Sequence, residues 1–174
     1  AGTLVAWTIL DVVRTGKPTA VGAATGIVVG LVAITPAAGF VGPVSAIALG
    51  FIAAFPSYFA LLWRAKTQLD DSLDVVAAHG VGGTTGALLT GVFAHKSLIG
   101  VADGLLFGNP GQLGTQAVAV LAAIVYSGVV SFILLKIMGA VIPLRANAAD
   151  EGVGLDVSQH GEEAYVHAGG STVA

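Results

Sequence analysis

Long apolar stretches alternate with short polar segments along the chain. One stretch, residues 75–94, contains no Asp, Glu, Lys or Arg, and it has about the 20 residues that a helix needs to cross a bilayer. We expect one helix in each of five apolar ranges: 1–13, 19–34, 44–63, 75–94 and 113–142. The pattern predicts an all-α protein, a polytopic transmembrane helical bundle over residues 1–142.

A polar tail follows the last apolar stretch and begins at Pro143, which cannot continue a helix. Half of the 10 acidic residues of the chain lie in residues 143–174. Low hydrophobicity and repeated acidic groups are typical of segments that stay in water. We therefore predict two regions, a transmembrane region over residues 1–142 and an aqueous tail over residues 143–174.

Basic residues indicate which side of the bundle faces the cytoplasm. Loops that alternate along the chain lie on the same side of a membrane. The basic residues of one side are Arg14, Lys17, Arg64, Lys66 and Arg145, and the other side has Lys96. Basic loops prefer the cytoplasm. We expect a multi-pass protein of the cell inner (cytoplasmic) membrane with a cytoplasmic C-terminus.

The composition supports a membrane protein and excludes several other classes. Only 10% of the residues are charged and 55% are hydrophobic, whereas soluble domains carry about 25% charged residues. The lack of cysteine excludes disulfides and thiolate metal sites, and no basic patch indicates a nucleic-acid partner. We find no phosphate-binding glycine loop, nucleophile elbow or paired catalytic carboxylates. The sequence thus predicts no catalytic residue, no metal site, no cofactor and no enzyme.

The first residues resemble the middle of a membrane helix. Residues 1–5 read AGTLV, without a starting Met or the basic n-region of a signal peptide. We therefore expect the chain to be the C-terminal part of a longer protein. The alternative is that Ala1 is a processed start.

Small residues recur at a spacing of four in two of the expected helices. The glycines concerned are Gly22, Gly26 and Gly30 in one helix, and Gly82 and Gly86 in another. Residues four apart share a helix face, and small side chains there let two helix backbones approach closely. The pattern is common in membrane helices and predicts a tightly packed bundle, not a function.

His79 is the candidate functional residue. It lies in the uncharged run 75–94, and an ionisable side chain inside a membrane segment is costly and usually faces a partner or a cavity. Its neighbours Ala78 and Gly80 leave room around the imidazole, which offers a donor and an acceptor nitrogen. The alternative is a structural histidine that is hydrogen-bonded between two helices.

Acidic residues lie just before this run. Asp70, Asp71 and Ser72 are typical of a helix N-terminus, where carboxylates are stabilised by the free N–H groups. Asp74, five residues before His79, either caps the same helix or orients a neighbouring helix. His79 approaches the centre of the bilayer only if its helix begins near Asp71–Asp74.

Several strings resemble the ammonium transporter (Amt/Mep/Rh) family. The strings are GKP at residues 16–18, GIVVGLVAITPAAG at 26–39, DDSLDV at 70–75, HGVGG at 79–83 and EGVGLD at 151–156. They occur in the order and spacing of the family, from about residue 5 to residue 166. The last string, with residues 160–165, resembles the tail of the bacterial and archaeal Amt branch and argues against an Rh-type gas channel.

The resemblance implies an inverted-repeat transporter of eleven helices, assembled as a homotrimer with one pore in each protomer. This chain is then the C-terminal fragment, helices seven to eleven plus the cytoplasmic tail. His79 matches the second histidine of the family's twin-histidine pair, and Val75 matches an apolar pore position. Thr25 and Thr35 match small hydroxyl positions near the conduction path. The partner histidine and the outer cation site belong to earlier helices.

The resemblance also implies a regulatory tail that binds a PII-type signal protein at the cytoplasmic face. The matching residues are Gly154, Leu155, Asp156, His160, Gly161, Glu162 and Tyr165.

Two functional hypotheses follow. The first is transport of ammonium or ammonia across the membrane, with ammonium deprotonated near the pore mouth and ammonia conducted past the twin histidines. The alternative is an ammonium-sensing regulatory membrane protein that signals through its tail.

Overall fold

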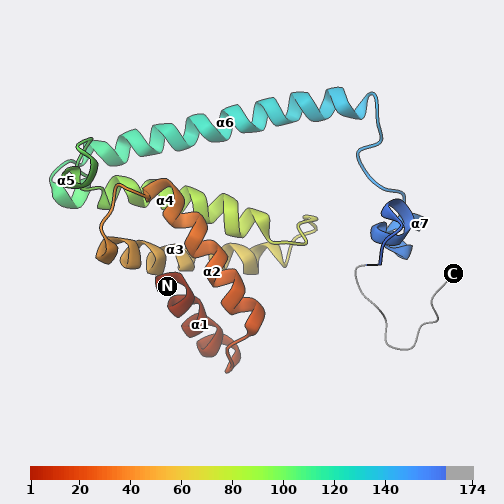
Figure 1. Cartoon of the computed structure of the whole chain (residues 1–174), viewed down its shortest axis with the longest axis horizontal. Coiled ribbons are helices and arrows are strands. Elements are labelled where there is room, and N and C mark those ends of the chain that lie inside the picture. The colour runs from red at the N-terminus through yellow and green to blue at the C-terminus, as the bar shows by residue number, and fades with distance from the viewer. Residues whose placement is uncertain (164–174) are drawn as a thin grey trace. The chain divides into compact units, whose positions relative to one another are not determined.

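A computed structural model describes residues 1–163, and every regular element in that part of the chain is a helix (Figure 1). The predicted all-α fold class is thus confirmed for these residues. The chain divides into two compact units, Ala1–Ile124 and Val125–Ala174. Each unit is described by itself.

The first unit contains the helices α1 (Gly2–Thr15), α2 (Ala20–Ile34), α3 (Pro43–Arg64) and α4 (Gly82–Phe93), and it also includes the first part of α6 (Gly111–Gly139). Helices α1, α2 and α3 contact one another, and α4 packs against α2 and α3 (Figure 1). Four short elements connect them or follow α4: η1 (Thr35–Ala37), the π-helical turn η2 (Val76–Val81), α5 (Lys96–Ile99) and η3 (Leu105–Phe107).

Local sequence signals explain where these helices begin and end. The Thr19 hydroxyl accepts a hydrogen bond of 2.9 Å from the Gly22 N–H at the start of α2, as an N-cap does. Pro43 occupies the first turn of α3, where its missing N–H is not needed. Gly16, with a φ of 80°, ends α1 in the left-handed conformation that glycine adopts without strain.

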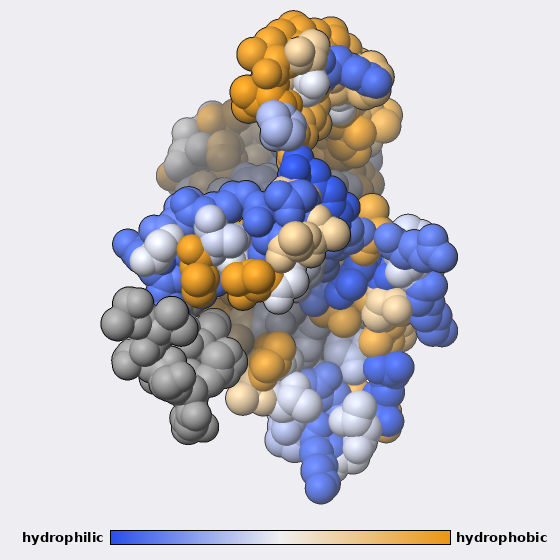
Figure 2. Space-filling view, turned by 90° about the vertical axis from the view of Figure 1, so that its right-hand side faces the viewer, coloured by the Kyte–Doolittle hydropathy of each residue, from blue (hydrophilic) through white to orange (hydrophobic). Residues whose placement is uncertain are grey.

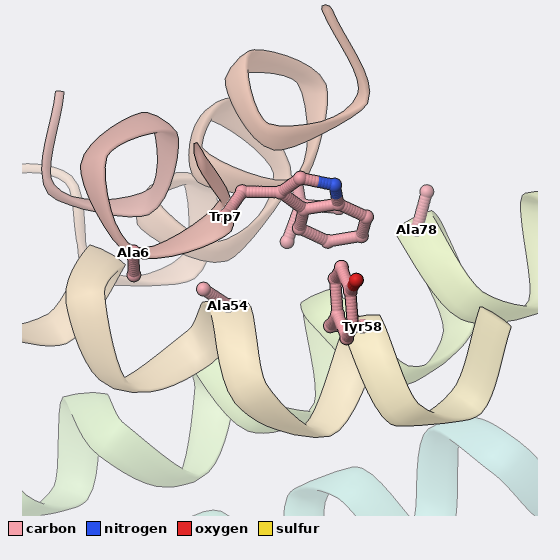
Figure 3. Packing of buried hydrophobic residues seen from close by; sticks show 6 residues of the cluster. Ala6, Trp7, Ala54, Tyr58 and Ala78 are labelled. Carbon is pink, nitrogen blue, oxygen red and sulfur yellow. The ribbon is translucent and has the colours of Figure 1, made fainter. Parts of the chain in front are cut away.

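Small side chains make the core of this unit compact. One buried cluster contains Ala6, Trp7, Val29, Ala54, Tyr58 and Ala78 (Figure 3). A second contains Ala33, Ala37, Leu49 and Ala53. A Cβ atom on Gly86 would overlap the Ala33 carbonyl, and one on Gly26 would lie 2.8 Å from Trp7 Cβ. The glycine spacing therefore corresponds to backbones in close contact.

Helix α6 (Gly111–Gly139) is the longest helix, with 29 residues, and none of its residues is buried within the described structure. By length and composition, three described segments could cross a membrane: Ala20–Ala37, Pro43–Arg64 and Gly111–Gly139. Helices α1 and α4 have 14 and 12 residues, which is less than the roughly 17–25 residues of a spanning helix.

The second unit contains the end of α6 and two short elements, α7 (Ala148–Val153) and the π-helical turn η4 (Asp156–His160). The Asn147 side chain caps α7 by accepting a hydrogen bond of 2.8 Å from the Asp150 N–H. Figure 2 shows the hydrophobic surface at the end of α6 and the mostly hydrophilic surface of α7 and η4.

The helix bounds differ from the expected ranges at several ends. The expected helix 44–63 is Pro43–Arg64, and the expected helix 113–142 is Gly111–Gly139. The expected helix 75–94 is a π-helical turn followed by α4, which ends at Phe93. The division into a membrane region and an aqueous tail at residue 142 refers to a bilayer and stays a prediction.

Candidate functional site

The segment before His79 is fixed by one carboxylate. The two oxygens of Asp71 accept hydrogen bonds of 2.8 Å from the N–H groups of Val75 and Val76. These N–H groups belong to the N-cap residue and the first residue of η2, and such groups have no partner within their own helix. The capping role predicted for Asp71 is thereby confirmed. The turn that follows is π-helical, a rare form that is frequent at functional sites.

Electrostatics favour the ionised form of Asp71. The hydrogen bond from the Val76 N–H, the largest effect, and that from the Val75 N–H hold the pKa of Asp71 below its ordinary value. The positive charge of Arg64 lowers this pKa further. The carboxylate therefore caps η2 in its charged form at neutral pH.

Asp74 connects the same segment to α3. Its carboxylate forms an ion pair with the Arg64 guanidinium at the end of α3. Its φ of 54° is the only positive φ of a non-glycine residue in the described part of the chain. Aspartate tolerates this conformation better than most residues. Asp74 thus contacts a neighbouring helix, as the orienting role requires, and that role stays a prediction.

His79 lies on the exposed side of η2. Ala77 and Ala78 face the bundle and are buried, whereas His79 and Val75 are exposed. Val75 and His79 are four residues apart in one helical segment, so their side chains lie on the same face. The imidazole has no hydrogen-bond partner among the described residues, so both of its nitrogens are available to a further group.

The two threonines predicted near the conduction path lie apart from each other. The Thr25 hydroxyl donates to the Val21 carbonyl at 2.9 Å, and the Thr35 hydroxyl donates to the Leu31 carbonyl at 2.7 Å. They are ten residues apart, which is about 15 Å along a helix. The structure brings Val75 and His79 together on one turn, and no described contact joins either threonine to that turn.

A cavity of about 220 Å³ lies where α1, α2, α3 and the Asp74 segment meet. Its lining includes Trp7, Asp11, Arg14, Thr25, Tyr58 and Asp74. Asp11 is 8% exposed, and its carboxylate accepts hydrogen bonds of 3.1 Å from the hydroxyl groups of Thr19 and Tyr58. A buried carboxylate is costly unless it is hydrogen-bonded in this way.

The sequence prediction did not include Asp11 or Tyr58. A signal was present, because Asp11 is an acidic residue inside the expected apolar range 1–13, and such residues usually face the interior of a bundle. Its partner Tyr58 is 47 residues away in the sequence, so no local pattern connects the two.

The tail residues form a small structure of their own. Gly154 and Gly161, with φ values of 109° and 67°, flank Leu155, Asp156 and His160, and the Glu162 N–H donates to the Asp156 carbonyl at 3.0 Å. Tyr165 lies outside the described residues. The regulatory role of this segment stays a prediction.

No group of three or more His, Asp or Glu side chains within residues 1–163 is arranged to hold a metal ion. The functional argument therefore depends on the imidazole, hydroxyl and carboxylate groups described above.

Comparisons with known proteins identify the relatives of this chain. The model of the Ammonium Transporter Family matches residues 1–165. An ammonium transporter of Aquifex aeolicus is 47% identical over 161 residues, which cover 92% of this chain and 38% of the relative. The chain spans about two fifths of the length of the curated relatives it matches.

Solved structures give the same relationship. The crystal structure of Saccharomyces cerevisiae Mep2 matches with a TM-score of 0.78 and 35% identity, over 86% of this chain and 35% of the Mep2 chain. A structure named Sensor Amt Protein matches with a TM-score of 0.78 and 32% identity, over 91% of this chain and 38% of its own.

Proposed function

This chain belongs to the ammonium transporter family, and we propose that the protein containing it carries ammonium or ammonia across the cytoplasmic membrane. The observation that carries the proposal is His79, an exposed imidazole without a hydrogen-bond partner among the described residues. It lies on a π-helical turn whose start is capped by Asp71. A fixed turn with a free imidazole is suited to contacting a small polar solute.

The proposed mechanism follows from the cost of moving a charge through an apolar path. A bare ammonium ion loses its hydration inside a membrane at a large free-energy cost. Ammonium that gives up its proton to water at the pore mouth leaves neutral ammonia, which crosses an apolar pore at a far lower cost. His79 then offers ammonia one donor and one acceptor nitrogen. Potassium has no proton to give up and is rejected.

Other parts of the pore lie outside this chain under this proposal. A second histidine beside His79 and a cation site at the pore mouth are supplied by earlier helices. Val75 provides an apolar wall on the same turn, and Thr25 and Thr35 lie along the path. The relatives are named transporters, and the mechanism contains no chemical conversion apart from proton transfer, so the protein is not an enzyme.

We further propose a multi-pass topology with the C-terminus in the cytoplasm. The three candidate spanning segments support the multi-pass arrangement, and the basic residues before α2 and after α3 support the orientation. The complete protein forms a homotrimer. A PII-type signal protein binds at the cytoplasmic face, and residues 154–165 take part in that contact.

A second candidate function is ammonium sensing. The similarity to the structure named Sensor Amt Protein favours it, because the match covers 91% of this chain. In a sensor, ammonium binding changes the conformation of the tail and the flux through the pore is incidental.

Reconstitution of the complete protein in proteoliposomes tests the two functions. We expect ammonium uptake that protein-free liposomes do not show, and a current only where the released proton crosses the membrane as well. Ammonium binding without uptake would favour the sensor. Neither binding nor uptake would contradict both functions.

A further inference from the structure

A buried carboxylate lies beside the cavity that Tyr58 and Asp74 also line. Asp11 of α1 accepts hydrogen bonds from Tyr58 of α3 and from Thr19 beside α2, both at 3.1 Å. The free energy needed to bury a carboxylate is large, and apolar residues could fill the same volume. An acid in this position is therefore expected to have a role beyond filling space.

Close approach of α2 completes this cluster. A Cβ atom on Gly22 would overlap the Asp11 Oδ2 atom and would lie 2.6 Å from the Thr19 hydroxyl. A larger residue at this position would make the Asp11 and Thr19 side chains shift from their present positions. Three elements of the bundle thus converge on Asp11.

Tyr58 extends from Asp11 toward η2. Its side chain is 4% exposed, and its ring meets the ring of Trp7 edge-on, with centroids 5.0 Å apart and an interplanar angle of 74°. Figure 3 shows both rings between α1 and α3, with Ala78 beside them. The hydroxyl bond to Asp11 and the contact with Trp7 together fix the position of the Tyr58 ring.

Ala78 connects the packing of the Tyr58 ring to the histidine. It is 4% exposed, belongs to the same buried cluster as Tyr58, and directly precedes His79 in the π-helical turn. The His79 ring has no hydrogen bond of its own among the described residues. Its position therefore depends on the backbone of η2, which is held at its start by Asp71 and at its back by the aromatic pair.

We propose that Asp11 is a positioning residue for His79 and acts through the Tyr58 ring and Ala78. The inference rests on the proposed function, because it assigns His79 to the conduction path. Loss of the hydrogen bond between Asp11 and Tyr58 lets the Tyr58 ring shift. The His79 imidazole is then held less precisely in the position where it binds ammonia. Small displacements of a positioned group are known to have large effects on its chemistry.

The test measures the ratio of ammonium to potassium uptake by the complete protein in proteoliposomes. Tyr58→Phe removes the donor of this hydrogen bond, and Asp11→Ala removes its acceptor together with the acceptor of the Thr19 hydroxyl. We expect each to lower the ratio roughly three- to tenfold, the effect of one buried hydrogen bond. The double variant should lose no more than the larger single loss, because both changes break the same interaction.

A conservative variant and a matched control separate positioning from general damage. Asp11→Asn keeps an oxygen that accepts from Tyr58, so it should recover most of the ratio. Tyr126→Phe removes the same hydroxyl from an exposed tyrosine of α6 and should leave the ratio unchanged. If Asp11→Ala does not assemble, the positioning role is tested by Tyr58→Phe, which should lower the ratio, and by Asp11→Asn, which should keep most of it.

The outcomes distinguish this inference from the proposed function. An unchanged ratio in Tyr58→Phe, when His79→Ala has lost it, would overturn the positioning role alone. Losses that add in the double variant would overturn it as well. A parent protein without uptake, or a normal ratio in His79→Ala, would overturn the proposed function and this inference with it.

Discussion

Single polar side chains fix the geometry around His79. The Asp71 carboxylate binds two N–H groups that η2 leaves unpaired, and Asp74 pairs with Arg64 at the end of α3. Ser57 is different, because its buried hydroxyl has no partner among the described residues. Substitutions of Asp71 and of Ser57 should therefore have different effects on the stability of the protein.

The Asp71 cap should weaken in acid. Its folded-state pKa lies below the unfolded value of 3.8, so its contribution to stability is fully present above that value and is lost as the pH falls through the folded pKa. Hydrogen exchange of the Val75 and Val76 amides should therefore become less protected in that range. Asp71→Asn should show weaker protection at neutral pH and little further loss in acid. Equal protection in both proteins at neutral pH would contradict the charged cap.

Ser57→Ala should not destabilise the protein. The hydroxyl is 0% exposed and has no partner among the described residues, and an unsatisfied buried group costs about 1–3 kcal/mol. We expect the free energy of unfolding in detergent to stay the same or to rise by up to about 2 kcal/mol. A fall of more than about 1 kcal/mol would mean that Ser57 has a hydrogen-bond partner in the complete protein.

The sequence indicated some of these residues and not others. His79 stands out because it is ionisable within an uncharged run, and Asp71 because acidic residues gather before a helix. The pairing of Asp11 with Tyr58 could not be predicted, because it depends on how α1 and α3 pack. Hydropathy is a property of each residue and carries no information about which two helices meet.

Close backbone contacts at glycine hold helices α2 and α4 together. Gly86 of α4 faces the Ala33 carbonyl of α2 without room for a Cβ atom. Close backbones of this kind gain dispersion contacts that larger side chains would prevent. The packing of α4 also fixes η2, because the two elements are continuous.

Gly86→Ala should therefore destabilise the bundle. The new methyl group must push α2 and α4 apart, and overpacking of this kind costs about 1–3 kcal/mol. Gly128→Ala is the control, because no atom lies within 4 Å of a Cβ atom there, and alanine raises helix propensity by up to about 1 kcal/mol. Thermal midpoints of the complete protein in detergent measure both. Equal midpoints for the two variants would refute the close contact.

The long helices were easier to predict than the turn that bears the histidine. Helix α3 begins one residue earlier and ends one residue later than the expected range 44–63, because a run of apolar residues with Pro at its start specifies a helix strongly. The π-helical turn was not predicted. It has the same apolar residues as an α-helix, and its packing against α3 involves residues far away in the sequence.

The whole molecule combines a packed bundle with a separate second unit. Unit Ala1–Ile124 contains the buried clusters and His79, and unit Val125–Ala174 contains α7 and η4. The tail makes its own hydrogen bonds, for example from Ser158 to the Gly154 carbonyl at 2.8 Å. We therefore expect transport and regulation to be separable.

Removal of residues 144–174 from the complete protein tests this separation. Uptake of ammonium in proteoliposomes should persist, because the proposed path is in the bundle. Inhibition by an added PII-type protein should disappear, because the docking segment that we propose is absent. Loss of uptake with normal trimer assembly would show that the tail is part of the transport path.

The most direct measurement is the ratio of ammonium to potassium uptake by the parent protein and by its His79→Ala variant, at equal amounts of folded protein. His95→Ala is the matched control. His95 lies at the start of α5, and the centroid of its ring is 4.3 Å from the centroid of the Phe107 ring. The account predicts that the ratio falls at least about tenfold in His79→Ala, the equivalent of about 1.4 kcal/mol, and stays unchanged in His95→Ala. Equal ratios in the parent and His79→Ala would contradict the assignment of His79 to the conduction path.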